Sequence, residues 1–162
     1  ISAALGRVQI RRHDSMLLRR RRIHETYSAN FAELEGIRPC PEYTGSSHHL
    51  YTIEIDPQLT TRDDFAAMIE SQNIRTGLHF IPLYRFSHYQ KRYQHTYKST
   101  DSNLPLEQEW KLHYSASEQI FSRLLSLPIY SSMSDQDIVD VVDAVKSAYS
   151  QLELEQREKN PS

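Results

Sequence analysis

The chain has 162 residues, a formal net charge of −2 at pH 7 and a single cysteine, Cys40. This length suits one ordinary domain with accessory helices and is too short for two large domains. The small net charge provides no overall field for nucleic acid or an anionic membrane, and one cysteine excludes an internal disulfide. No apolar run approaches the ~20 residues that span a bilayer. We therefore expect a cytoplasmic protein with no nucleic-acid or membrane partner.

The first segment predicts helix from Ser2 to about Leu34, because its apolar residues recur mostly at intervals of three or four. Gly6 and the pair His13-Asp14 interrupt the pattern, so one long helix and two consecutive helices both fit. The chain begins with Ile1 already inside this pattern, and we interpret it as part of a longer protein. The apolar positions are Leu5, Val8, Ile10, Met16, Leu17, Ile23, Tyr27, Phe31 and Leu34.

The middle of the chain predicts two strands around a helix. His48 to Ile55 (HHLYTIEI) alternates in the manner of a half-buried strand. Thr60 or Thr61, followed three residues later by an aspartate, resembles a capping box. The helix that it begins carries Phe65, Met68 and Ile69. A second strand is predicted from Ile74 to Phe80.

The last third predicts a surface loop at 99–105, a helix from about Leu106 to Leu124 and a short apolar run at 125–130. Ser134 and Asp137 are expected to cap a final helix with one apolar stripe. We assign the fold class α+β, a short and mainly antiparallel sheet covered by helices. The expected organisation is a linking helix or helix pair at 1–36, a small domain at 37–154 and a charged tail at 155–162.

No self-contained active site is visible in the sequence. None of the eight histidines has the HExxH or Cys/His zinc spacing, and four glycines do not make a phosphate loop. The basic run Arg19 to Arg22 extends around a full helical turn, so it cannot form one stripe. We interpret it as solvated or interface-forming rather than as a nucleic-acid contact.

Several polar residues are candidates for ligand binding. His48 and His49 are adjacent in the predicted strand and therefore lie on opposite faces, so at most one of them can face a given pocket. His79 ends the second predicted strand, just before Phe80-Ile81-Pro82. The segment from Tyr84 to Tyr93 concentrates aromatic and cationic side chains. These could stack on a base or sugar and pair with a diphosphate, or they could form a helix whose Phe86, Tyr89 and Tyr93 lie in the core.

Separated segments together resemble the DegT/StrS-type sugar aminotransferases. The start ISAALGRVQI is similar to their I-x-A-A-L-G-x-x-Q-L helix, and LLRRRRIHETY to the Arg-rich helix after it. HHLYTIEI resembles their H-L-Y-x-I strand. RDDFAAMIESQNIRTGLHFIPLY resembles the passage that ends H-F/Y-x-P-L-H, and LLSLPIYSSMSDQDIVDVVDAV resembles L-S-L-P-x-x-P-x-L-T-x-x-E-x-x-x-V-x-x-A-V. Their order and spacing extend over residues 1 to about 149.

The resemblance implies the C-terminal part of a fold-type I aminotransferase. Such an enzyme is a homodimer that uses pyridoxal 5'-phosphate (PLP) to move an amino group from glutamate or another amino acid to a nucleotide-linked keto-sugar, in polysaccharide or cell-surface glycan biosynthesis. The resemblance places the cofactor mainly on an upstream domain. It therefore implies no catalytic or cofactor-binding residue in this chain, where Lys91, Lys98, Lys111, Lys146 and Lys159 lack the setting of a cofactor lysine.

Residue by residue, the resemblance implies a substrate-binding set at the mouth of the active site. Tyr84 stands where the family more often has histidine, and Asn73 replaces its usual glycine. The alternative reading is a non-catalytic ligand-binding or protein-interaction domain. The substrate-binding candidates are His79, Tyr84, Thr76, Arg85 and His49.

Overall fold

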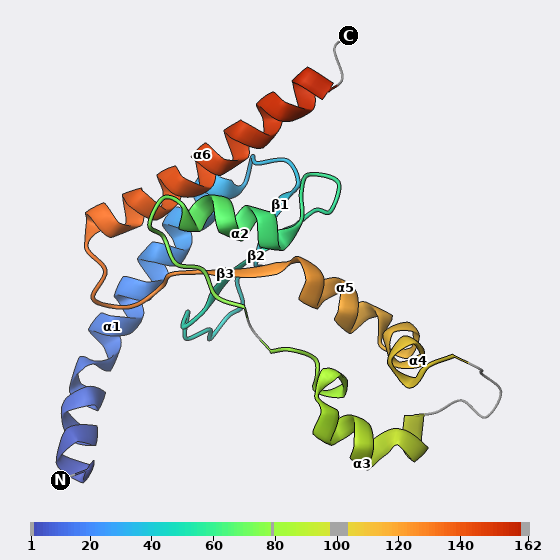
Figure 1. Ribbon diagram of the computed structural model, residues 1–162. Helices are drawn as coiled ribbons and strands as arrows, with labels where there is room; N and C mark the ends of the chain where they lie inside the picture. Colours follow the sequence, from blue (N-terminus) through green and yellow to red (C-terminus); the bar gives the residue numbers. More distant parts are fainter. Residues whose placement is uncertain (1, 79, 98–103, 160–162) are drawn as a thin grey trace.

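The computed structural model describes residues 2–78, 80–97 and 104–159, and it is an α+β fold, as predicted (Figure 1). Within these residues a small sheet is surrounded by helices. In chain order the elements are α1 (Ser2–Phe31), β1 (Ile37–Pro39), β2 (Tyr51–Ile55), α2 (Arg62–Glu70), the 3-10 helix η1 (Leu83–Arg85), α3 (Ser87–Tyr97), α4 (Leu106–His113), α5 (Ser115–Arg123), β3 (Leu124–Leu127) and α6 (Asp135–Lys159).

The sheet is antiparallel, with β2 between β1 and β3. Tyr51 pairs with Leu127 and Ile53 with Leu125, so these four side chains share one face. All four are buried. This apolar face is the centre of the core, and the predicted alternation along β2 is correct from Tyr51 onward.

Helices α1 and α6 supply much of the cover for the core, and aromatic rings join α1 to the sheet. The ring of Tyr27 lies 5.0 Å from that of Tyr51 in an edge arrangement. Both rings are fully buried, and each hydroxyl has a partner: Tyr27 donates to the Pro128 carbonyl at 2.9 Å, and Tyr51 lies 3.2 Å from the Ser28 hydroxyl. Burial raises the pKa of Tyr51 to about 12 and that of Tyr27 further.

Two predicted helix starts are confirmed. Thr61 caps α2 and exchanges hydrogen bonds with Asp64, and Phe65 and Ile69 of that helix are buried. At α6 the Ser134 amide donates to Asp137 at 2.7 Å, and the Asp137 amide donates back to the Ser134 hydroxyl at 3.1 Å. These bonds satisfy amide groups that a helix leaves open at its start.

Helix α6 continues through Lys159, past Leu154, where the sequence predicted a charged tail to begin. Leu152 is the last core residue of this helix, and the charged residues that follow remain helical. These charged residues include no proline or glycine that would end the helix, so the backbone hydrogen bonding continues.

The predicted strand from His48 to Ile55 is too long, because pairing begins at Tyr51. His48 has a left-handed φ of 46°, which breaks extended pairing. The expectation that His48 and His49 lie on opposite faces of a strand is therefore wrong. His48 is buried, and its ring lies 4.9 Å from that of His24, whereas His49 is exposed.

The predicted strand from Ile74 to Phe80 is also wrong. Of the residues in this stretch that the structure describes, which exclude His79, only Gly77 pairs with the sheet, through an isolated bridge to Ser126. Asn73 and Phe80 have left-handed φ angles of 65° and 50°, which turn the chain away from an extended path on each side.

The predicted helix at 106–124 is two helices, α4 and α5, which meet at Tyr114, and Leu124 begins β3. The short strands β1 and β3 were not predicted. Both depend on β2 as their partner, and such pairing between distant segments leaves little local signal. In the segment after η1, Phe86 and Tyr89 are exposed, so they do not form the core alternative considered from sequence.

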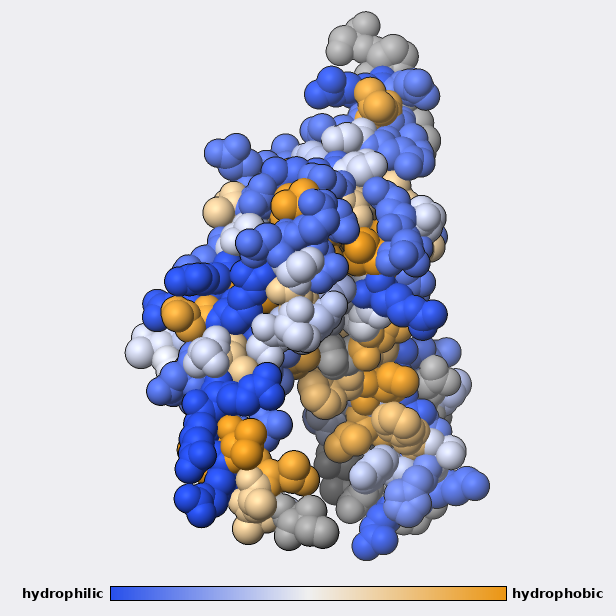
Figure 2. Space-filling view, turned by 90° about the vertical axis from the view of Figure 1, so that its left-hand side faces the viewer, coloured by the Kyte–Doolittle hydropathy of each residue, from blue (hydrophilic) through white to orange (hydrophobic). Residues whose placement is uncertain are grey.

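Helix α1 is continuous, and its two halves differ in surroundings. The second half buries Ile23, Tyr27 and Phe31, whereas Leu5 and Ile10 of the first half are exposed. Figure 2 shows hydrophobic surface on the first half of α1, which projects from the rest of the molecule. No helix among the described residues is long and apolar enough to cross a membrane.

The basic run of α1 braces the fold. Arg19 donates to the Met133 carbonyl at 2.7 Å and pairs with Asp135 at 2.7 Å, so it connects α1 to the start of α6. Arg20 donates to the Ser47 carbonyl at 2.9 Å. These contacts agree with the interpretation of the run as interface-forming.

Two glycines with the same backbone conformation allow a test of how closely the turn at Gly36 approaches Leu59. Gly36 and Gly45 have φ angles of 80° and 82°, but an added Cβ would lie 3.1 Å from Leu59 at Gly36 and would meet open space at Gly45. We expect Gly45→Ala to lower the free energy of unfolding by about 1 kcal/mol and Gly36→Ala by about 2 to 3 kcal/mol, since the latter adds overpacking to backbone strain. Urea unfolding of both variants measures this, and equal losses would contradict the close approach.

Candidate functional site

The main candidate site is a cavity of about 550 Å³ beside the end of β3. Its walls come from four segments that are distant in the sequence: His49-Leu50 before β2, residues 73–77 after α2, residues 126–130 and the first two turns of α6. Antiparallel pairing and the Gly77 bridge bring these segments together. The polar side chains of the lining are His49, Asn73, Arg75, Thr76, Ser126, Tyr130, Asp137 and Asp140.

Backbone geometry positions the wall formed by residues 73–77. Asn73 adopts a left-handed conformation after α2, and Gly77 then exchanges two backbone hydrogen bonds with Ser126, each 2.9 Å long. Thr76 lies just before this bridge and donates its hydroxyl to Glu70 at 3.0 Å. The threonine is thus fixed at the edge of the cavity by its own helix and by the sheet.

The charges around the cavity are mixed. Arg75 brings one cation, whereas Asp137 and Asp140 bring two carboxylates from α6. Hydrogen bonds from Ser134 lower the pKa of Asp137, so this side chain is ionised at neutral pH. His49 has its Nδ1 atom 2.8 Å from the Ser47 hydroxyl. Hydroxyl, imidazole and carboxylate groups at one rim suit a ligand that carries several hydroxyl groups.

The structure divides the predicted binding residues into two places. His49 and Thr76 line the same cavity. Tyr84 and Arg85 belong to η1 and contact α5 instead. His79, the strongest match to the family pattern, lies outside the described residues.

Tyr84 and Arg85 converge on one carboxylate of α5, that of Glu118. The Tyr84 hydroxyl donates to Oε1 at 2.7 Å, Arg85 Nε donates to Oε1 at 3.0 Å, and Arg85 Nη2 donates to Oε2. The hydrogen bond from Arg85 is the main reason why the pKa of Glu118 is lowered, whereas burial and the bond to Glu118 raise the pKa of Tyr84.

Sequence reasoning missed Glu118, Arg75, Tyr130 and Asp140. Glu118 had a detectable signal, because it stands between two aromatic residues, Tyr114 and Phe121, at helical spacings of four and three. That pattern marks one face of a helix. The cavity residues had no such signal, because the four segments that they come from meet only after folding.

PLP-dependent aminotransferases hold their cofactor through a lysine in a pocket. The lining of the cavity contains no lysine. Lys146 donates its Nζ to Asn30 Oδ1 at 2.7 Å, which engages it between α6 and α1. Among the described residues no group of three or more His, Cys, Asp and Glu side chains is arranged to hold a metal ion.

Comparison with known proteins agrees with the fold and with the motifs. SpsC, a spore coat polysaccharide biosynthesis protein of Bacillus subtilis, is 32% identical over 90% of this chain and 35% of its own length. The dTDP-4-dehydro-2,3,6-trideoxy-D-glucose 4-aminotransferase of Saccharopolyspora spinosa is 26% identical over 91% of this chain and 34% of its own length. The aminotransferase TlmJ from Streptoalloteichus hindustanus superposes with a TM-score of 0.71 at 25% identity, over 93% of this chain and 36% of TlmJ.

The chain therefore spans about a third of the length of the curated relatives that it matches. The likeness is not confined to one motif, since residues 1–146 match a single family. The chain belongs to the DegT/DnrJ/EryC1/StrS aminotransferase family.

Proposed function

We propose that the protein carrying this chain moves an amino group from an amino acid, glutamate in the first instance, to a nucleotide-linked keto-sugar in polysaccharide or cell-surface glycan biosynthesis. The observation that carries the proposal is the family match over residues 1–146. Two relatives, one named as a polysaccharide biosynthesis protein and one as an aminotransferase of a dTDP-linked sugar, support the substrate class. A cytoplasmic location and a homodimeric state are part of this proposal.

In this proposal the chain forms the sugar side of the active site. Thr76 and His49 share a cavity whose hydroxyl, imidazole and carboxylate groups suit a sugar ring. His79 follows them in the family motif and is proposed to orient the sugar nucleotide, with Tyr84 and Arg85 next along the chain. Since Thr76 and His49 each have an intramolecular hydrogen-bond partner, their side chains are held in place before a substrate arrives.

The cofactor is proposed to be held by residues outside this chain. PLP supplies an electron sink for the amino-group transfer when it is bound. The residues described here bind and orient the sugar and exclude water from one side of it. Lys146, for its part, is engaged in a contact between α6 and α1.

The first test measures the role of His79 in the full-length protein. We expect His79→Ala to lower kcat/KM for the sugar nucleotide about tenfold to a hundredfold, mainly by raising KM, since one hydrogen bond to a charged group is lost. Amination of the cofactor by glutamate should remain near normal. Glu158→Ala on the exposed end of α6 is the control. Unchanged sugar kinetics with an early melting transition would make His79 a structural residue.

The second test concerns the 162-residue chain alone. Incubated with PLP and then reduced with borohydride, it should show only scattered and substoichiometric modification of lysines by mass spectrometry. The physical reason is that a Schiff-base lysine needs a pocket that activates its amine, and the lining of the candidate cavity contains no lysine. One lysine labelled stoichiometrically would contradict the proposal that the cofactor is held elsewhere.

The third test concerns the homodimer and the first half of α1. Leu5, Val8 and Ile10 are 62%, 50% and 76% exposed, and exposed apolar side chains of this kind favour association. We expect the apparent mass of the chain to rise with concentration in light scattering, and Leu5→Ser with Ile10→Ser to weaken association about tenfold. Leu154→Ser on α6 is the control, and a concentration-independent monomer would contradict this role of α1.

A further inference from the structure

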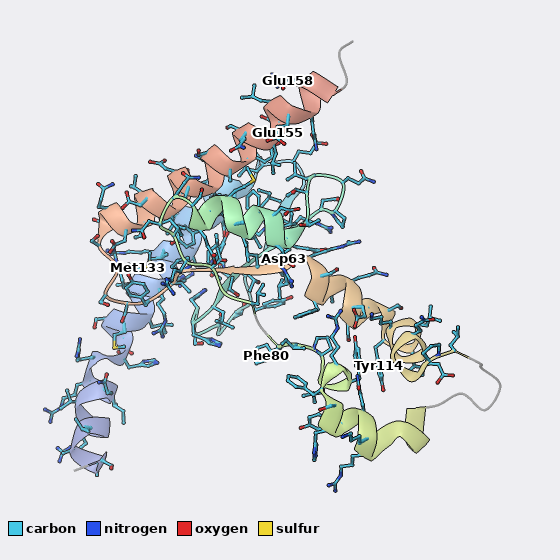
Figure 3. The ribbon with its side chains drawn as sticks, viewed as in Figure 1. Asp63, Phe80, Tyr114, Met133, Glu155 and Glu158 are labelled. Atoms are coloured by element: carbon cyan, nitrogen blue, oxygen red, sulfur yellow. The ribbon has the colours of Figure 1, made fainter. Side chains whose placement is uncertain are left out.

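Helix α5 presents three residues on one face toward η1. Tyr114, at the N-cap position of α5, Glu118 and Phe121 are four and three positions apart, which places them side by side on a helix. Figure 3 shows Tyr114 on the same side of the molecule as η1, facing the start of α3. All three contact Tyr84 or Arg85 of η1, and we call these three residues the α5 face.

The contacts on the α5 face are of a kind that fixes orientation. Arg85 binds Glu118 through two nitrogens, a planar arrangement that is stronger and more directional than a single bond. Its guanidinium also lies 4.8 Å from the centre of the Phe121 ring. The Tyr84 ring stacks on that of Tyr114 at 5.0 Å with an interplanar angle of 10°. Glu118 itself is largely buried, with 16% of its side chain exposed.

The chain just before η1 needs such an anchor. Gly77 is tied to Ser126, but Leu78 and residues 80–82, which follow it, make no pairing with the sheet. Leu78, Phe80 and Ile81 are 56%, 84% and 48% exposed, and Phe80 has a left-handed φ of 50°. Burial in the core thus does little to set the course of this segment. Its two ends are held by Ser126 and by Glu118.

We propose that Glu118 is a positioning residue for the nucleotide-sugar site. It acts through Tyr84 and Arg85: the carboxylate fixes η1 against α5, and so sets the positions of these two residues and of residues 80–82, which lead into η1. Glu118 does not touch the substrate. This inference rests on the proposed function, because that function assigns residues 76–85 to the sugar nucleotide.

The chemistry of the pair explains why a carboxylate is used. Glu118 accepts three hydrogen bonds and keeps its charge because its pKa is lowered, and Tyr84 keeps its proton because its pKa is raised. Glutamine at this position could accept from one side but would lose the charge and one of the two acceptor oxygens. Alanine would leave the Arg85 guanidinium without its carboxylate and the Tyr84 hydroxyl without its acceptor.

The test uses the full-length protein with three variants and one control. Glu118→Ala should raise the KM for the sugar nucleotide about tenfold with little change in the half-reaction with glutamate, because misplacement by about 1 Å is costly at a reacting site. Glu118→Gln and Tyr84→Phe should give smaller increases, about threefold, since each keeps part of the contact set. Glu158→Gln, on the exposed end of α6, should leave the KM unchanged.

A second readout follows the backbone directly. In hydrogen–deuterium exchange, peptides covering residues 78–86 should exchange about tenfold faster in Glu118→Ala than in the unaltered protein, because local opening becomes easier. Peptides from α2 and α6 should not change. Glu118→Gln and Tyr84→Phe keep the measurement informative if the alanine variant unfolds.

The outcomes separate this inference from the proposed function. Unchanged exchange at 78–86 in folded Glu118 variants would overturn the anchoring role. Faster exchange with an unchanged KM for the sugar nucleotide would overturn the positioning role. If the unaltered protein aminated no nucleotide-linked keto-sugar, the proposed function would fail and the role of Glu118 in the sugar site would fail with it, while exchange would still decide whether Glu118 anchors η1.

Discussion

The pairing of β2 with both neighbouring strands is the constraint on which the rest of the structure depends. Because Tyr51 stands opposite Leu127 and Ile53 opposite Leu125, one face of a very small sheet becomes wholly apolar. Such a sheet cannot exclude water alone. Helices α1 and α6 supply much of the missing cover, and the buried rings of Tyr27 and Phe31 connect α1 to Tyr51.

The same pairing creates the candidate site. Where β3 ends, the chain turns through residues 128–133 into the capped start of α6, and the Gly77 bridge draws the chain after α2 to the free edge of β3. The cavity lies where these segments meet. Four polar side chains of its rim, those of His49, Thr76, Asp137 and Asp140, are already hydrogen-bonded within the fold, so part of the site is fixed by the same contacts that stabilise the structure.

A second set of stabilising contacts, between η1 and α5, lies away from the sheet. The region of η1 and α3 leaves several apolar side chains exposed, and the contacts that fix η1 are polar and aromatic: the Glu118 carboxylate and the rings of Tyr114 and Phe121. Polar anchoring of this kind is directional and depends on charge. Apolar packing in the core is not directional and does not depend on charge. The two halves of the proposed substrate-binding set therefore depend on different physical interactions.

The sequence by itself determined the α+β class, the extent of the first helical segment to within a few residues, the caps at Thr61 and Ser134, the alternation along β2 and the family. Each of these is local, since helical periodicity, caps and alternation are expressed by neighbouring residues. Only the tertiary structure decided that β3 is a strand, that Ile74 to Phe80 is not, and that His48 turns away from the sheet. It also decided that Thr76 meets His49 while Tyr84 meets Glu118. These outcomes depend on pairing between residues that are dozens of positions apart, and no local pattern encodes which partner is available.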